Sequence, residues 1–150
     1  MRKLIMILLS ILLVVTLVAC SNVPIPPPQG ITVNDIDFEK VDGNSLTDAQ
    51  IKMIEKNKVD KGYSYWQEDK AFYIVIFAGE QPTGGYAFDV KSVEDNEGKT
   101  NILVELTPPK DMATRVLTYP YTIIKAEGIT DNFNIVDTNG EVYKLIRSDL

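Results

Sequence analysis

The chain has 150 residues, no histidine and one cysteine, and its 21 acidic residues exceed its 15 basic residues to give a net charge of −6. Without histidine or a second cysteine, serine–histidine and cysteine–histidine catalysis and thiolate or zincin-type metal sites are excluded. The negative charge disfavours nucleic acid as a partner. These counts favour a binding protein over an enzyme, and no cofactor is expected.

The N-terminus has the pattern of a secretory signal. Two basic residues precede an uncharged apolar run over residues 4–19, which is shorter than a membrane-spanning helix requires. An uncleaved membrane anchor is the alternative interpretation. The motif Leu17-Val18-Ala19-Cys20 is similar to the lipobox of bacterial lipoproteins. This resemblance implies that residues 1–19 are a removed signal peptide and that Cys20 carries lipid, palmitate included.

The segment after Cys20 differs in composition from the rest of the chain. Residues 20–30 contain four prolines, which favour a stiff, extended spacer. Residues 31–150 are long enough to bury a core and are expected to form a single domain. The predicted mature protein is therefore one domain attached to the cell membrane through lipid and facing outside the cytoplasm.

The first predicted elements are a strand and a helix. Residues 31–41 alternate loosely between apolar and polar side chains, as a half-exposed strand does. A break follows, and Ser45 or Thr47 can cap a helix that we place over residues 46–58. The apolar side of this helix is narrow, which suits packing on a sheet.

The core strand is predicted over residues 71–78. It follows a strand that includes residues 63–66 and a reversal over residues 67–70. Residues 71–78 are apolar at almost every position, which is typical of a central strand covered on both faces. We expect the helix on one face and further structure on the other.

Antiparallel pairing is predicted for the second half of the chain. The strands are residues 86–91 with 101–107, residues 119–127, and residues 133–137 with 141–146. Gly98 marks the first turn, and Asn139-Gly140 is a strong hairpin signal for the last. Together these elements predict an α+β fold, a mainly antiparallel β-sheet with one N-terminal helix packed on it.

The loop over residues 79–86 is the principal candidate site. It contains one proline and an adjacent glycine pair, which together favour a fixed backbone shape. A tight hairpin turn between the flanking strands is one interpretation, and a recognition loop is the other. Recognition is favoured if this loop meets Pro108-Pro109 and Tyr119-Pro120-Tyr121 at one edge of the sheet.

Residues 70–127 resemble the C-terminal domain of the protease complex subunit PrcB. The matching elements are Ala78-Gly79, Gln81-Pro82-Thr83-Gly84-Gly85-Tyr86, the alternating Phe88 and Val90, Pro108-Pro109, and Tyr119-Pro120-Tyr121 leading into Ile123-Ile124-Lys125. The resemblance implies a non-enzymatic, lipid-anchored subunit that stabilises an extracytoplasmic protease or its complex. The predicted partner-binding residues are Gln81, Pro82, Thr83, Gly84, Gly85, Tyr86, Tyr119, Pro120 and Tyr121.

Two other functions stay open. The motif Gln81-Pro82-Thr83-Gly84-Gly85-Tyr86 is similar to the Asn-Pro-Thr-Thr-Gly-Tyr loop of chagasin-type cysteine protease inhibitors, and Tyr119-Pro120-Tyr121 is similar to their Arg-Pro-Trp loop. In this chain glutamine replaces the asparagine, and a glycine-rich middle loop is missing. The third candidate is a carboxylate-dependent hydrolase that acts on envelope polymers.

Acidic and aromatic groups elsewhere have simpler interpretations. Glu94, Asp95 and Glu97, and again Asp137 and Glu141, lack the spacing of a calcium loop, so we expect solvated turns and no metal site. The aromatic set Tyr63, Tyr65, Trp66, Tyr119 and Tyr121 is either an interface or cross-strand and core packing.

Overall fold

The computed structural model describes residues 34–110 and 113–147. Of these residues, 52% lie in strands and 12% in helical turns. Among them, no helix has the length and hydropathy needed to cross a membrane. The predicted signal peptide, Cys20 and the spacer lie outside the described residues, and their assignments stay predictions.

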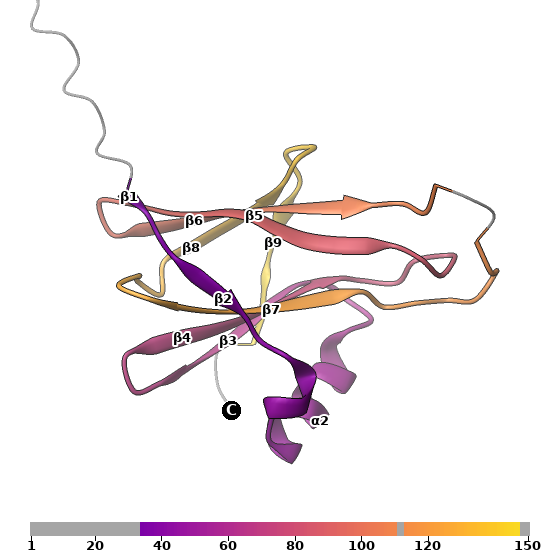
Figure 1. The fold of residues 1–150 in the computed structure, drawn as a ribbon, viewed down its shortest axis with the longest axis horizontal. Coiled ribbons are helices and arrows are strands. Elements are labelled where there is room, and N and C mark those ends of the chain that lie inside the picture. The colour runs from indigo at the N-terminus through magenta and orange to yellow at the C-terminus, as the bar shows by residue number, and fades with distance from the viewer. Residues whose placement is uncertain (1–33, 111–112, 148–150) are drawn as a thin grey trace, which may run out of the picture. The chain divides into compact units, whose positions relative to one another are not determined.

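The described chain forms two five-stranded sheets (Figure 1). The first sheet has the order β1 (Asn34–Asp35), β5 (Ala87–Asn96), β6 (Lys99–Thr107), β8 (Phe133–Asp137) and β9 (Val142–Tyr143). The second sheet has the order β10 (Leu145–Arg147), β3 (Lys61–Glu68), β4 (Ala71–Ala78), β7 (Tyr121–Glu127) and β2 (Phe38–Lys40). Each sheet contains one parallel pair, β6 with β8 and β3 with β10, and is otherwise antiparallel.

The second sheet lies between the first sheet and a helix. Its inner face packs on the first sheet to form the larger apolar core, in which Ile74, Ile102 and Ile135 are fully buried. Its outer face carries α2 (Asp48–Asn57), whose Met53 and Ile54 pack on that face (Figure 1). The result is a sandwich of two sheets with one helix as a third layer.

The central position predicted for residues 71–78 is confirmed. Ile74 and Ile76 of β4 belong to the core between the sheets, whereas Val75 and Phe77 belong to the core beneath α2. All four side chains are 0% exposed. Burial of such side chains stabilises a fold by roughly 1.5–3 kcal/mol each, so β4 contributes substantially to both cores.

The predicted helix is also confirmed, with Thr47 as its cap. The Thr47 hydroxyl accepts a hydrogen bond from the Gln50 amide at 3.4 Å, and the Gln50 side-chain carbonyl accepts one from the Thr47 amide at 2.7 Å. This reciprocal pair is a capping box, which satisfies two amides at the helix start. The helix spans residues 48–57, within the range predicted from its periodicity.

The predicted fold class is wrong. The described residues are mostly β, with two mixed sheets, and their one α-helix follows β1, β2 and a short 3-10 turn (Gly43–Ser45) at residues 48–57. Alternation of side chains shows that a strand has two faces but does not reveal which strand lies beside it. The parallel partners β3 and β10 are about 80 residues apart in the chain, and no turn signal joins such partners.

Near each end of the described chain, consecutive edge strands belong to different sheets. The strand predicted over residues 31–41 is in fact β1 in the first sheet followed by β2 in the second. The predicted pairing across Asn139-Gly140 is confirmed for β8 and β9, but the chain then passes to the second sheet as β10. These crossings occupy the edges of both sheets, which limits edge-to-edge association.

The passage of the chain from β9 to β10 predicts that glycine is required at position 62. A Cβ at Gly62 would overlap the carbonyl oxygen of Lys144 and lie 2.8 Å from Cγ1 of Ile146. Gly62→Ala should therefore lower the free energy of unfolding by about 1–3 kcal/mol, because the β3–β10 contact must open. Urea unfolding followed through Trp66, the single tryptophan, measures this loss.

Gly43→Ala is the matched control, because a Cβ at Gly43 has nothing within 4 Å. Equal stability of the Gly62→Ala and Gly43→Ala chains would contradict the close contact between β3 and the segment that leads into β10.

Candidate functional site

The loop over residues 79–86 is not a hairpin turn. It leaves β4 in the second sheet and enters β5 in the first sheet, where β5 pairs with β6 and β1. The hairpin interpretation is wrong, because the two flanking strands have no hydrogen-bonded pairing with each other. The loop instead spans the end of the sandwich.

This loop pairs with the segment that precedes β7. Gln81 and Thr118 exchange two backbone hydrogen bonds, from Gln81 N to Thr118 O at 2.8 Å and from Thr118 N to Gln81 O at 3.0 Å. The Ala78 amide donates to the Pro120 carbonyl at 2.9 Å, which joins this bridge to the β4–β7 ladder. The antiparallel pairing of β4 with β7 therefore continues beyond the sheet.

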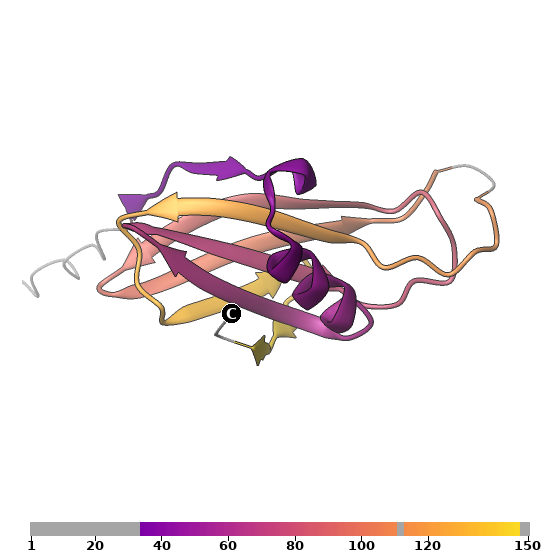
Figure 2. The same ribbon diagram turned by 90° about the horizontal axis from the view of Figure 1, so that it is seen from below.

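Two further bonds hold the outer part of the loop. The Gly84 amide donates to the Thr114 carbonyl at 3.1 Å, and the Thr118 hydroxyl donates to the Thr83 carbonyl at 2.7 Å. We call residues 79–86 together with residues 113–120 the tip. Figures 1 and 2 show these two segments side by side at the end of the sandwich opposite to β1.

Glycine is required at the position where the loop turns towards β5. Gly85 has a φ of +83°, in the left-handed region that side chains disfavour. A Cβ there would also lie 3.2 Å from the Cβ of Pro109. The structure thus brings Pro109 against the loop, as the sequence pattern suggested for the Pro108-Pro109 pair.

Tyr119 lies beside the loop and the C-terminal end of α2. The Tyr119 hydroxyl donates to a Glu80 carboxylate oxygen at 3.1 Å, and the Lys58 ammonium lies 5.7 Å from the Tyr119 ring centroid. The hydrogen bond to Glu80 raises the pKa of Tyr119, which keeps its hydroxyl a donor. Tyr121 remains 39% exposed, with its ring 6.3 Å from that of Phe77.

The predicted partner-binding residues are therefore gathered at one end of the domain. Gln81, Pro82, Thr83, Gly84, Gly85 and Tyr86 lie on one strand of the tip, and Tyr119, Pro120 and Tyr121 lie on or next to the other. Sequence patterns did not indicate Thr114 and Thr118, which hold the loop through backbone and hydroxyl hydrogen bonds. A single threonine in an irregular segment does not indicate a contact with a loop about 30 residues away in the chain.

The other three aromatic residues belong to the core, not to this surface. Tyr63 and Trp66 are buried, and Tyr65 packs edge-on against Phe133 with ring centroids 5.0 Å apart. Core packing is therefore the correct interpretation for Tyr63, Tyr65 and Trp66.

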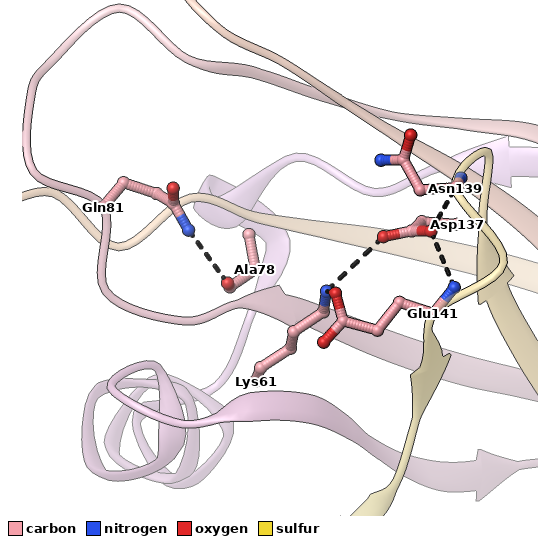
Figure 3. Close-up of polar contacts among 6 residues, drawn as sticks. All are labelled: Lys61, Ala78, Gln81, Asp137, Asn139 and Glu141. Atoms are coloured by element: carbon pink, nitrogen blue, oxygen red, sulfur yellow. Dashed lines mark hydrogen bonds and ion pairs between the residues drawn. The ribbon is translucent and has the colours of Figure 1, made fainter.

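A polar cluster lies on the other side of Gly79. Asp137 accepts hydrogen bonds at Oδ1 from the amides of Asn139 and Glu141, at 2.8 and 2.9 Å, and its Oδ2 lies 3.4 Å from the Lys61 ammonium (Figure 3). Lys61 also forms an ion pair with Glu141. With Gly79 and Gln81, these groups line a groove of about 460 Å³.

The solvated turn predicted for Asp137 is wrong, because this carboxylate is buried. Burial alone would raise the pKa of Asp137, but the two amide donors and the Lys61 ammonium outweigh it and hold that pKa below its ordinary value. Burial lowers the pKa of Lys61, and the hydrogen bond to Glu141 with the nearby carboxylates more than reverses this effect. The cluster joins β3 to the β8–β9 turn beneath the start of the loop.

The described residues hold no group of three or more metal-ligating side chains of the histidine, cysteine and carboxylate types. The carboxylate of Asp137 is instead engaged by protein donors on both oxygens. The tip therefore presents backbone, tyrosine and apolar groups in a fixed arrangement.

Comparison with known proteins identifies the segment that contains this site. Residues 72–127 match the family model of the PrcB C-terminal region. The resemblance drawn from the sequence is confirmed over these residues. The match runs from β4 to the end of β7 and so includes the whole tip.

The chain is also similar to Uncharacterized protein MJ1373 of Methanocaldococcus jannaschii. The two are 35% identical over 74 residues, which make up 49% of this chain and 44% of that protein. The alignment thus spans less than half of either chain. No solved structure matches the chain.

The geometry of the tip predicts that replacement by alanine has different effects on stability at two adjacent glycines. Gly85→Ala should cost about 1–2 kcal/mol of stability, because alanine disfavours a positive φ and its methyl group would press on Pro109. Gly84→Ala is the matched control, since its Cβ would meet only Thr118 Cγ2 at 3.9 Å. Urea unfolding and hydrogen exchange of the Gln81 amide compare the two variant chains. Equal losses of stability in both chains would contradict a loop with a fixed backbone.

The polar cluster predicts a pH dependence. Because the pKa of folded Asp137 lies below the ordinary value of 3.8, its ionised form stabilises the fold above that pH, and this stabilisation is lost as pH falls through the lowered pKa. Asp137→Asn should cost about 1.5–3 kcal/mol at pH 7, because it weakens charge-assisted hydrogen bonds. It should also reduce the loss of stability on acidification.

Urea unfolding at a series of pH values from neutral to acid tests this prediction. Glu141→Gln is the control, since its exposed ion pair with Lys61 contributes about 1 kcal/mol or less. If the Asp137→Asn chain loses as much stability on acidification as the wild-type chain does, Asp137 is not the source of that loss.

Proposed function

We propose that this chain is a non-enzymatic, protein-binding module that associates with an extracytoplasmic protease or its complex and prolongs its lifetime. The observation that carries the proposal is the tip. Its two hydrogen-bonded segments bring the predicted binding residues together, and they lie within the segment that matches the PrcB C-terminal family.

Preorganisation of the tip supports a role in recognition. A loop that is already ordered loses less conformational entropy on binding than a slack loop does. Here the Gln81–Thr118 bridge, the Gly84–Thr114 bond and the Thr118 hydroxyl hold the backbone before any partner arrives. Tyrosine is a frequent anchor at protein interfaces, and Tyr121 is exposed beside this ladder.

The tip lies far from the residue at which the described chain begins. Asn34, where the described chain begins, pairs with Asp95 near the end of β5, whereas the tip precedes Ala87 at its start. A ten-residue strand is about 30 Å long. The tip and the pairing of Asn34 are therefore separated by about the length of β5, so a partner at the tip need not contact β1.

The lifetime of the protease is the first prediction of this proposal. Addition of the full chain to an active extracytoplasmic protease complex should lengthen its half-life at unchanged initial turnover. The Tyr119→Ala, Tyr121→Ala double variant should weaken the association about 30-fold, because it removes two aromatic anchors. Turnover and half-life of the complex are measured in the same assay.

Gln67→Ala is the control, since Gln67 is exposed and lies at the far end of β3. A fall in initial turnover on addition of the chain would instead identify an inhibitor. Unchanged turnover together with an unchanged half-life would reject the proposed function.

Attachment to the cell membrane is the second prediction. Cys20→Ala removes the thiol that the lipobox resemblance assigns to lipid, and two or more acyl chains are needed for stable anchoring. Fractionation should show the wild-type chain with membranes and the Cys20→Ala chain released from them. Retention of the variant in membranes would favour an uncleaved N-terminal anchor.

A further inference from the structure

Two adjacent apolar side chains of the tip face solvent. Val116 and Leu117 are 56% and 55% exposed, although they directly precede Thr118, which is fixed by its bridge to Gln81. The Val116 amide donates to the Thr114 carbonyl at 2.8 Å, and the Thr114 carbonyl also accepts from Gly84. These apolar groups are thus displayed by an ordered backbone, not by a slack loop.

Two basic side chains belong to the same connection between β6 and β7. Lys110 and Arg115 are exposed, and neither forms an ion pair with any residue that the structure describes. The chain as a whole carries a net charge of −6. Exposed apolar and unpaired basic groups therefore occur together on this part of an acidic protein.

The opposite end of the sandwich has a different chemistry. A hollow of about 520 Å³ near β1 and β2 is lined by Asp35, Asp37, Glu39 and Glu127, with Lys125 as its one basic group. The surface around Arg115 and this acidic hollow therefore favour partner surfaces of different charge, while the Glu80 carboxylate of the tip is engaged by the Tyr119 hydroxyl.

We infer that Val116 and Leu117 are the apolar anchors of the tip and that they enter an apolar depression, flanked by carboxylates, on the partner protein. Arg115 and Lys110 would pair with those carboxylates at the rim. This inference rests on the proposed function, and it adds these four residues, which sequence patterns did not indicate, to the contact made by Tyr119 and Tyr121.

A protein partner fits these groups better than a lipid bilayer does. Two aliphatic side chains bury much less apolar surface than a single myristoyl chain, which by itself binds membranes only marginally. A pocket in a protein can enclose both side chains, and the basic groups then add specificity.

Photo-crosslinking in the native envelope tests the inference. Full-length chains carry benzoylphenylalanine in place of Leu117, Tyr121 or Val142, the last being a control that is 57% exposed on β9. The Leu117 probe should crosslink to a protease-complex subunit at a site lined by apolar and acidic residues, and the Val142 probe should not.

Binding measurements with that purified complex supply the second readout. Leu117→Asp and the Lys110→Glu, Arg115→Glu double variant should each weaken binding about tenfold or more. Val142→Asp changes an exposed position of β9, and Lys144→Glu changes the exposed position that follows this strand; both should leave binding unchanged. Unchanged urea unfolding midpoints verify that each variant chain is folded.

The remaining outcomes separate the two proposals. In one outcome, the Tyr121 probe crosslinks to the protease complex, whereas the Leu117 probe crosslinks to lipid, to a second copy of this chain or to nothing. This outcome would overturn the inference and retain the proposed function. No protease crosslink from either position would overturn both. A loss of binding in the Val142→Asp chain equal to that in the Leu117→Asp chain would also overturn the inference.

Discussion

The structure depends on the burial of β4 on both of its faces. One face of this strand forms the core shared with the first sheet, and the other forms the core beneath α2. Its antiparallel partners, β3 and β7, run along its full length. A strand held in this way has little freedom to shift, because a one-residue slip would exchange its two buried faces.

The rigidity of β4 extends to the tip. The β4–β7 ladder continues through the Ala78–Pro120 bond to the Gln81–Thr118 bridge, so the loop starts in a direction that the core determines. On its other side, a Cβ at Gly79 would meet the Lys61 backbone nitrogen at 3.1 Å, which shows how closely β3 packs beneath the loop. Lys61 is in turn joined to Asp137 and Glu141, so the C-terminal hairpin also supports this position.

The local elements of the fold could be predicted from the sequence, but the arrangement of the sheets could not. Thr47 and the helix after it, the apolar run of β4 and the Asn139-Gly140 turn all have signals within a few residues. The parallel pairs and the crossings between β1 and β2 and between β9 and β10 join positions without a local signal. A prediction of a single antiparallel sheet follows when only adjacent strands are paired, and this is why the fold class was wrong.

The candidate site shows the same limit at the level of single residues. Pro82 and the Gly84-Gly85 pair mark an ordered loop, but they are equally typical of a hairpin, and only the assignment of β4 and β5 to different sheets separates the two. Thr114 and Thr118 hold the loop from about 30 residues away, and Asp137 supports it from further still. Sequence patterns therefore identified residues 79–86 and Tyr119-Pro120-Tyr121, whereas the threonines that hold the loop and the exposed Val116 and Leu117 became visible only in three dimensions.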